Sequence, residues 1–156
     1  MNIRFLVHAG FAVLLPLAAL RGANADSRET LLKTIAGPVV ATVVRIVDGD
    51  TVVVVAHPWP DQSVHVAVRL RGIGAPELRS KCPFLKRAGK QAKLALAETI
   101  RPGDLVELRN IAGGKYYGRV VADLSRDNED LGAMLVKQGL AVRYDGGKRS
   151  RPACPA

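Results

Sequence analysis

The sequence of 156 residues predicts a mainly β domain of the α+β class, built as a small closed barrel with two packed helices. Three observations support this prediction: five short segments have strand patterns, a helical pattern follows the third segment, and another follows the fifth. This order is typical of a five-stranded OB-fold barrel. The chain has no internal repeat and no low-complexity tract, so we expect a single domain.

The first three strands are predicted from β-branched residues and from alternation. Val39 to Val47 and Thr51 to Val55 are rich in valine, and the turn residues Asp48-Gly49-Asp50 separate them. From Val64 to Arg71 apolar and polar residues alternate, which indicates a half-buried third strand. The segment His57 to Gln62 contains two prolines and an aspartate, so we expect a loop there.

The hydrophobic pattern changes to a helical period after Pro83. Between Phe84 and Ile100 the apolar residues recur at helical spacing, whereas lysines line a different face. We therefore expect an amphipathic helix, which Pro102-Gly103 ends. Its apolar positions are Leu85, Ala88, Ala92, Ala95 and Leu96, and its lysines are Lys86, Lys90 and Lys93.

Two more strands and a second helix complete the predicted domain. Leu105 to Ile111 and Tyr117 to Leu124 have strand patterns, with Gly113-Gly114 between them. Asp130 is a suitable N-cap for a helix whose apolar residues face inward. Gly139 marks the end of that helix, because glycine readily adopts the left-handed conformation found after a helix C-terminus.

The N-terminal segment has the pattern of a secretory signal peptide. One arginine precedes an almost wholly apolar run from Phe5 to Leu20, and the small residues in Ala23-Asn24-Ala25 form a cleavage site. We expect cleavage after Ala25. The alternative is a retained membrane anchor, although the run is short for a spanning helix and contains His8 and Pro16.

This interpretation divides the chain into three parts. Residues 1–25 are the signal peptide, residues 26–37 are a polar and partly helical lead-in, and residues 38–156 are the barrel domain with a basic C-terminal tail. The mature protein would be exported, either to a periplasm or as a secreted protein, and would have no membrane segment. We expect it to be a monomer.

The composition favours a polyanionic partner and a disulfide. The chain has 23 Lys and Arg against 14 Asp and Glu, a formal net charge of +9. Such a surface favours nucleic acid or anionic lipid, although the charge alone also fits a merely soluble surface. Cys82 and Cys154 are an even pair in an exported chain, which favours a disulfide that contributes roughly 4 kcal/mol. Two free thiols and half of a metal site are the alternatives.

An aspartate between the first two strands is the first candidate for chemistry. Asp50 belongs to the motif Val47-Asp48-Gly49-Asp50-Thr51. A carboxylate in a tight turn is a suitable oxygen ligand for Ca²⁺ or Mg²⁺. The same residues also suit an ordinary hairpin turn, and the motif alone does not decide between these interpretations.

Two further candidates flank the end of the third strand. Arg69 lies on that strand, eight residues before Glu77. A guanidinium can bind two phosphate oxygens and keeps its charge at any relevant pH, although a solvated strand arginine has the same pattern. Glu77 follows a proline that restricts the backbone, and its carboxylate can accept a proton from water or orient that water for attack.

The last candidates lie at the predicted start of the fifth strand, in Tyr117-Gly118-Arg119. The tyrosine offers a face for a base or a hydroxyl for phosphate. Arg119 can neutralise charge on a leaving oxygen. Taken alone, this motif also suits an ordinary turn before a strand.

In order and spacing these motifs resemble those of the thermonuclease family, the staphylococcal-nuclease-like domain, from about Val39 to Tyr144. The resemblance implies Ca²⁺-dependent hydrolysis of DNA or RNA with little sequence preference, leaving the phosphate on the 3′ side. It also implies roles for the matching residues. Asp50 would bind Ca²⁺, Ala75 would lend its main-chain carbonyl to the metal, Arg69 and Arg119 would stabilise the transition state, and Glu77 would act on the attacking water.

Gly74 departs from the family pattern, because it stands where the family usually places a second metal-binding aspartate. The loss of a charged oxygen ligand should weaken Ca²⁺ binding by about one to two orders of magnitude. Three hypotheses follow: an exported metal-dependent nuclease, an OB-fold module that binds nucleic acid and has lost its metal ligand, and attachment to anionic lipid or cell-wall polymer through charge. Only the first requires a Ca²⁺-dependent gain in stability.

Overall fold

The computed structural model describes residues 33–147 and residue 154. The predicted signal peptide, residues 26–32 of the lead-in and most of the basic tail lie outside the described residues. Within residues 33–147, no helix is both long and apolar enough to cross a membrane. The described elements are β1 (Thr34–Ile35), β2 (Val39–Asp48), β3 (Thr51–Trp59), β4 (Gln62–Leu70), β5 (Ile73–Gly74), α2 (Pro83–Thr99), β6 (Leu105–Gly113), β7 (Arg119–Arg126), β8 (Glu129–Asp130), α3 (Leu131–Lys137) and β9 (Val142–Arg143).

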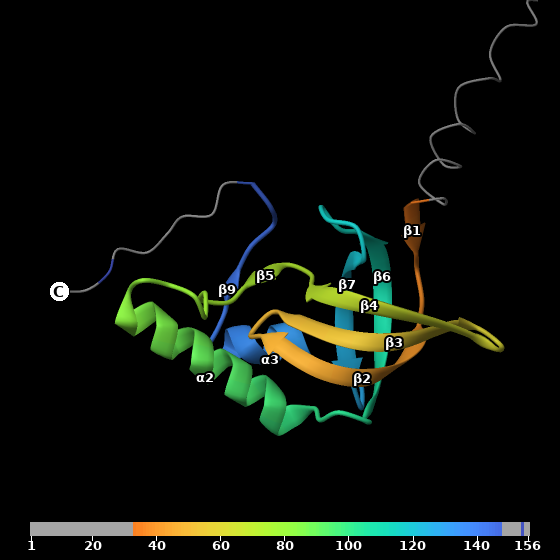
Figure 1. Cartoon of the computed structure of the whole chain (residues 1–156), viewed down its shortest axis with the longest axis horizontal. Helices are drawn as coiled ribbons and strands as arrows, with labels where there is room; N and C mark the ends of the chain where they lie inside the picture. Colours follow the sequence, from red (N-terminus) through yellow and green to blue (C-terminus); the bar gives the residue numbers. More distant parts are fainter. Residues whose placement is uncertain (1–32, 148–153, 155–156) are drawn as a thin grey trace, which may run out of the picture.

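Five of these strands close into a barrel in the order β6, β2, β3, β4, β7 and back to β6 (Figure 1). The pairs β2–β3, β3–β4, β2–β6 and β6–β7 are antiparallel, and β4–β7 is parallel. This confirms the predicted five-stranded OB-fold barrel with two packed helices. The short strands β5 and β9 pair separately, beside the barrel.

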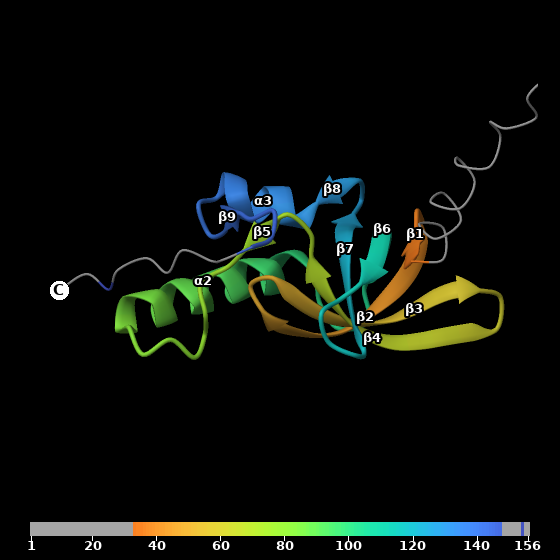
Figure 2. The same cartoon turned by 90° about the horizontal axis from the view of Figure 1, so that it is seen from above.

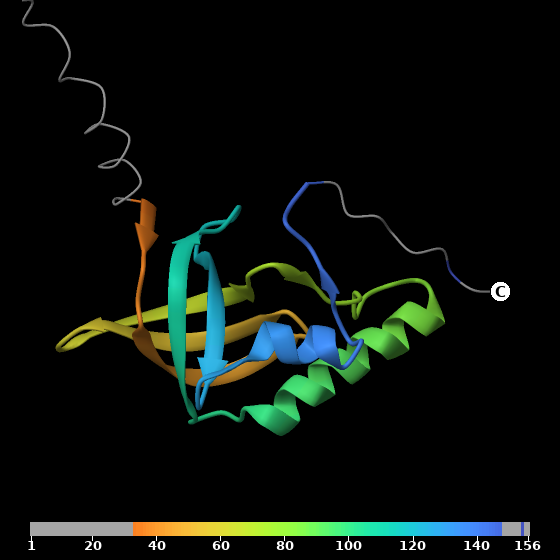
Figure 3. The same cartoon turned by 180° about the vertical axis from the view of Figure 1, so that it is seen from behind.

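The core fills the barrel and continues beneath the helices. Valine-rich β2 buries alternate residues from Val39 to Val43, as strand geometry requires, whereas β3 buries the consecutive residues 51–54. Both helices lie toward the end of the barrel that is opposite the β3–β4 hairpin (Figure 2). Seen from behind, α3 lies between β7 and α2 (Figure 3). Fully buried side chains include Val43, Val52, Val54, Val68, Leu70, Leu96, Leu108, Leu124, Leu131 and Leu135.

The two predicted helices are confirmed. α2 begins at Pro83, one residue before the expected start, and ends at Thr99. α3 begins after Asp130, whose side chain accepts a hydrogen bond from the backbone N–H of Ala133 at 2.6 Å. The helix therefore has the N-cap that the sequence predicts.

The prediction of a loop from His57 to Gln62 is wrong for most of that segment. β3 continues to Trp59, β4 starts at Gln62, and Trp59 pairs with Gln62. Proline is tolerated here because the hairpin projects beyond the barrel and the register shifts between Ala56 and Trp59, so that Pro58 removes no regular ladder hydrogen bond.

One other boundary needs correction. The fifth barrel strand starts at Arg119 instead of Tyr117, because Gly118 has a φ of +74° and turns the chain just before it. In the described part of the lead-in, Lys33 is helical and Thr34–Ile35 pairs with β6 as a strand, whereas residues 26–32 lie outside the described residues.

Candidate phosphate-binding cleft

A cleft of about 910 Å³ opens where the ends of β2, β3, β4 and β7 meet the segment before α2. Asp50 lies in the β2–β3 turn, Arg69 near the end of β4, and Arg119 at the start of β7. Glu77 follows β5 and is exposed. The lining consists of Val47, Asp48, Asp50, Arg69, Ala75, Pro76, Glu77, Leu78, Arg79, Lys115, Tyr116, Arg119 and Tyr144. The cleft thus brings together the predicted carboxylates and arginines from segments far apart in sequence.

Asp50 is buried, and both of its carboxylate oxygens accept hydrogen bonds. Its Oδ1 accepts from Nη1 of Arg69 at 2.6 Å and from the hydroxyl of Thr51 at 3.0 Å. Its Oδ2 accepts from the backbone N–H of Ala75 at 3.0 Å. Arg69 also donates from Nη2 to the carbonyl of Ile73 at 3.0 Å, so its guanidinium is held at two points. Its remaining N–H groups can donate to a ligand.

Thr51 links Arg119 to Asp50 by hydrogen bonds. Its Oγ1 accepts a hydrogen bond from Nη2 of Arg119 at 3.0 Å while it donates to Asp50. Thr51 was not among the predicted site residues. The sequence holds one indication of its role: Thr51 is a polar residue at the start of a strand whose next three residues are valines. All three valines are buried.

Arg119 has one buried nitrogen that still needs an acceptor. Among the described residues its Nε is buried and has no hydrogen-bond partner. Buried N–H groups in folded proteins are nearly always paired, so this N–H is a donor that an oxygen acceptor would satisfy. Together with the fixed guanidinium of Arg69, this donor suits a phosphate group.

The two aspartates of the β2–β3 turn have opposite pKa shifts. Burial acts to raise the pKa of Asp50, but the charge of Arg69 and the hydrogen bonds from Ala75, Arg69 and Thr51 outweigh it, so that this pKa is lowered. Burial, and then the negative charge of Asp50, raise the pKa of Asp48. Oδ1 of Asp48 accepts the backbone N–H of Asp50 at 3.1 Å.

Close packing against α2 fixes the position of this turn. A Cβ on Gly49 would lie 2.5 Å from the Cβ of Ala92 in α2 and 2.8 Å from the Cβ of Ala75. Real side chains do not approach so closely. The glycine therefore lets the turn, α2 and the segment after β5 meet at one point.

Tyr117, the predicted substrate-binding residue, is fully exposed and is not part of the cleft lining. Tyr116 lines the cleft instead, together with Lys115, whose ammonium lies 5.7 Å from the centre of the Tyr116 ring. The role of Tyr117 stays a prediction.

The donor set of the cleft falls short of a calcium site. Ca²⁺ takes about six to eight oxygen ligands, usually with several carboxylates. Residues 33–147 contain no cluster of three or more His, Cys, Asp or Glu side chains that could hold a metal. Gly74 is buried in β5, opposite Val142, and brings no carboxylate, while both oxygens of Asp50 already accept protein donors. Asp50 and Ala75 as metal ligands stay predictions.

The predicted disulfide is present. Cys82 and Cys154 are joined across 72 positions of the sequence. Cys82 is the residue before α2, so the bridge attaches the C-terminal segment to the start of that helix.

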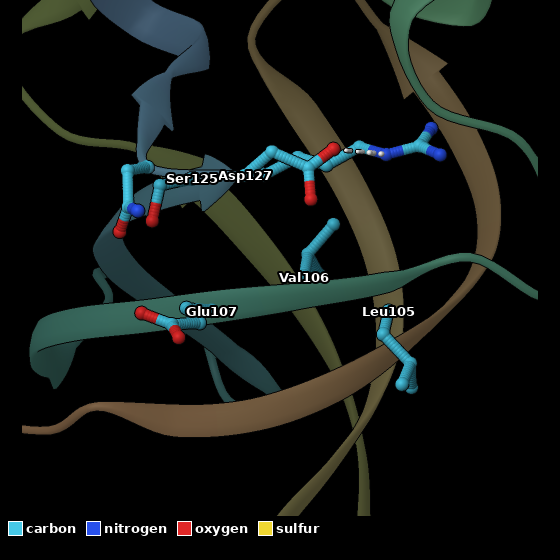
Figure 4. A pocket seen from close by; sticks show the side chains of 7 residues that line it. Leu105, Val106, Glu107, Ser125 and Asp127 are labelled. Carbon is cyan, nitrogen blue, oxygen red and sulfur yellow. Dashed lines mark ion pairs between the residues drawn. The ribbon is translucent and has the colours of Figure 1, made fainter.

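A second, smaller hollow of about 290 Å³ lies between β6 and the β7–β8 turn (Figure 4). It contains none of the predicted site residues. Arg126, which lines it, forms one ion pair with Asp104 and another with Asp127 of the same lining.

The fold and the cleft define a class of protein: a small OB-type barrel with a cleft at one end that arginines and carboxylates line. The profile of the family described as staphylococcal nuclease homologue matches residues 67–153, which is more than half of the chain. The protein therefore belongs to the staphylococcal nuclease homologue family, and its domain is nuclease-like. The matched range contains Arg69, Glu77 and Arg119, whereas Asp50 precedes it. The comparison with curated proteins gave no match.

Proposed function

We propose that the protein is an exported nuclease that hydrolyses phosphodiester bonds of DNA or RNA with low sequence preference. One observation carries the proposal: Arg69 and Arg119 are bound to the same Asp50–Thr51 pair, in a cleft that Glu77 also lines. Family membership supports it, since the family is named for a nuclease. We infer that the mature chain acts as a monomer in a periplasm or outside the cell.

The chemistry follows from the positions of three side chains. The guanidinium groups of Arg69 and Arg119 bind the non-bridging oxygens and stabilise the charge that grows on them in the transition state. Glu77 accepts a proton from the attacking water, whose oxygen forms a new bond to phosphorus. The bond to the 5′ oxygen breaks, this oxygen takes up a proton, and the phosphate stays on the 3′ side.

Calcium dependence belongs to the same proposal. Family members are typically Ca²⁺-dependent, and a bound divalent cation would add positive charge at the phosphate. Because the donor set here is incomplete, we propose that the response to Ca²⁺ is weak and that the arginines supply most of the positive charge at the phosphate. Asp50 and the carbonyl of Ala75 are the proposed ligands.

A second function is favoured by the protein donors that both oxygens of Asp50 already accept. If the oxygens of Asp50 serve only to hold Arg69 and Thr51, the cleft is a phosphate-binding site without a catalytic metal. The protein would then be an OB-fold module that binds nucleic acid with little turnover. Strand affinity that persists in chelator, without cleavage, would identify this function.

Cleavage of a labelled single-stranded oligonucleotide, with analysis of the product ends, tests the proposal. We expect products with a 3′ phosphate and a 5′ hydroxyl. Glu77→Gln should lower the rate by about two to four orders of magnitude, the usual contribution of a general base. Glu98→Gln, an exposed carboxylate at the other end of α2, is the matched control and should leave the rate unchanged. Equal rates for wild type and Glu77→Gln would contradict the mechanism.

A further inference from the structure

The exposed side of α2 carries a row of cations. Lys86 and Lys90 are exposed and Lys93 is half-buried, and we call these three residues the lysine stripe. The chain contains no acidic residue from Leu78 to Ala97, so every charged residue in this stretch is basic. Among the described residues, no carboxylate lies within ion-pair distance of a stripe residue.

Helix geometry places the lysine stripe beside the cleft. Gly89 of α2 packs under the cleft-lining segment, since a Cβ on it would lie 2.6 Å from the carbonyl oxygen of Pro76 and 3.2 Å from the carbonyl carbon of Glu77. The three lysines occupy positions i−3, i+1 and i+4 around Gly89. Residues three or four apart are neighbours on a helix surface. The stripe therefore borders the point where the cleft segment crosses the helix.

The stripe extends the basic surface of the cleft in one direction. Its lysines span about 10 Å along the helix axis, at 1.5 Å per residue. Arg79, which lines the cleft, lies in the chain between Glu77 and the start of α2. Lysines on flexible stems suit a polyanion whose charges are not fixed in position, because each ammonium can follow a phosphate.

We propose that the lysine stripe binds backbone phosphates of a single-stranded nucleic acid, outside the linkage held in the cleft. The inference rests on the proposed function in one respect, since that function makes nucleic acid the ligand. A single strand is flexible enough to turn from the cleft onto the helix, and proteins without sequence preference bind such strands through positively charged tracks. The stripe adds affinity for long substrates and takes no part in bond cleavage.

The test is binding of a fluorescein-labelled oligothymidylate of about 20 nucleotides, measured by anisotropy in chelator over a range of salt. The test variant is Lys86→Gln/Lys90→Gln/Lys93→Gln. The control, Arg101→Gln/Arg109→Gln/Lys137→Gln, removes the same charge from exposed positions outside the stripe. The double variant Lys86→Gln/Lys90→Gln replaces the triple variant if the latter unfolds.

We expect the stripe variant to bind the long strand at least tenfold more weakly than wild type. The slope of log affinity against log salt should fall by about 2, at roughly 0.7 for each lost phosphate contact on a single strand. Affinity for a thymidine dinucleotide should not change, because so short a ligand occupies only the cleft. The control variant should change the affinity and the slope much less.

Equal losses in the stripe and control variants would overturn the inference, since net charge would then explain both. An unchanged affinity in the stripe variant, or no binding by wild type, would also overturn it. Binding in chelator does not depend on cleavage. A wild-type protein that binds through the stripe and cleaves nothing would therefore overturn the proposed nuclease and support the stripe.

Discussion

The cleft and the lysine stripe are both basic, but they hold their cations in different ways. In the cleft, the side chain of Arg69 is only 17% exposed and donates to a buried carboxylate and to a carbonyl. In the stripe, Lys86 and Lys90 are exposed and have no carboxylate partner among the described residues. Fixed donors suit a reaction whose charge develops at one place, whereas mobile cations suit a flexible strand. Under the two proposals, this difference assigns catalysis to the cleft and strand affinity to the stripe.

Removal of the disulfide is the largest expected change and alters the stripe side of the molecule. Cys82→Ser/Cys154→Ser opens a loop of 72 residues that ends where α2 begins. The free energy of unfolding should fall by roughly 4 kcal/mol, because the unfolded chain loses a long-range constraint. Urea unfolding of the variant, of wild type and of reduced wild type measures this. An unchanged midpoint would show that the bridge does not stabilise the domain.

Arg119→Lys tests the fixed cations of the cleft. Lysine keeps the charge but lacks the Nε and the planar fork, so we expect the single-turnover cleavage rate to fall by about 10² to 10³, the scale of one lost transition-state donor. Arg109→Lys is the control, because Arg109 forms an exposed pair with Glu107. A loss smaller than tenfold at position 119 would show that its fork geometry is not used.

Asp50→Asn tests whether the cleft depends on its buried ion pair. It leaves the guanidinium of Arg69 without its partner and should lower the free energy of unfolding by roughly 3 kcal/mol. Glu107→Gln, which breaks an exposed ion pair, should lower the free energy of unfolding by less than about 1 kcal/mol.

The effect of Asp50 on stability should depend on pH. The folded pKa of Asp50 lies below its unfolded value, so its contribution to the free energy of unfolding is present above about pH 4 and is lost as the pH falls through the folded pKa. The difference in the free energy of unfolding between wild type and Asp50→Asn should therefore shrink in strong acid. An unchanged difference would contradict the stabilising role of ionised Asp50.

Gly74→Asp tests the incomplete donor set. The family resemblance implies that a carboxylate at position 74 would be a further oxygen ligand with Asp50, so the Ca²⁺ concentration that half-saturates the thermal shift should fall about ten- to a hundredfold. Ala133→Asp, on the exposed side of α3, adds the same charge elsewhere and serves as the control. If Gly74→Asp and Ala133→Asp respond equally to Ca²⁺, the added net charge explains the response and a new metal ligand does not.

Asp48→Asn is the smallest expected effect. Burial and the charge of Asp50 raise the folded pKa of Asp48, so its contribution to stability is full below its unfolded pKa and is lost as the pH rises through the folded value. At neutral pH the variant should be more stable by about 0.5 kcal/mol, the scale of a partly solvated charge pair. This gain should disappear in acid. Asp61→Asn at the β3–β4 hairpin should show neither change.

Local patterns in the sequence predicted most of the barrel. Valine-rich runs and the alternation after Val64 located three strands, and Asp130 located the start of α3. The parallel pairing of β4 with β7 was not predictable in this way, because no local signal records which distant strands meet. The hairpin at Trp59 was missed because Pro58 and Pro60 favour a loop, and a projecting hairpin tolerates them.

The grouping of four candidate residues could be predicted from the sequence, their hydrogen bonds could not, and their roles stay predictions. Asp50, Arg69, Glu77 and Arg119 were named from motifs, and the structure brings them to one cleft. The bridge through Thr51 depends on the approach of Arg119 from a segment 68 positions away, which no local pattern encodes. The basic face of α2 was visible as helical spacing, but its place beside the cleft depends on contacts of Gly89.

The most direct test of the central claim compares the single-turnover cleavage rate at saturating protein with strand affinity, for Glu77→Gln and for the stripe variant Lys86→Gln/Lys90→Gln/Lys93→Gln. We predict that Glu77→Gln loses at least a hundredfold in rate and keeps its affinity, since it removes the proton acceptor alone. The stripe variant should lose affinity at least tenfold and keep the rate. If wild type cleaves nothing, or if both variants lose rate and affinity together, the separation of catalysis in the cleft from affinity on α2 is contradicted.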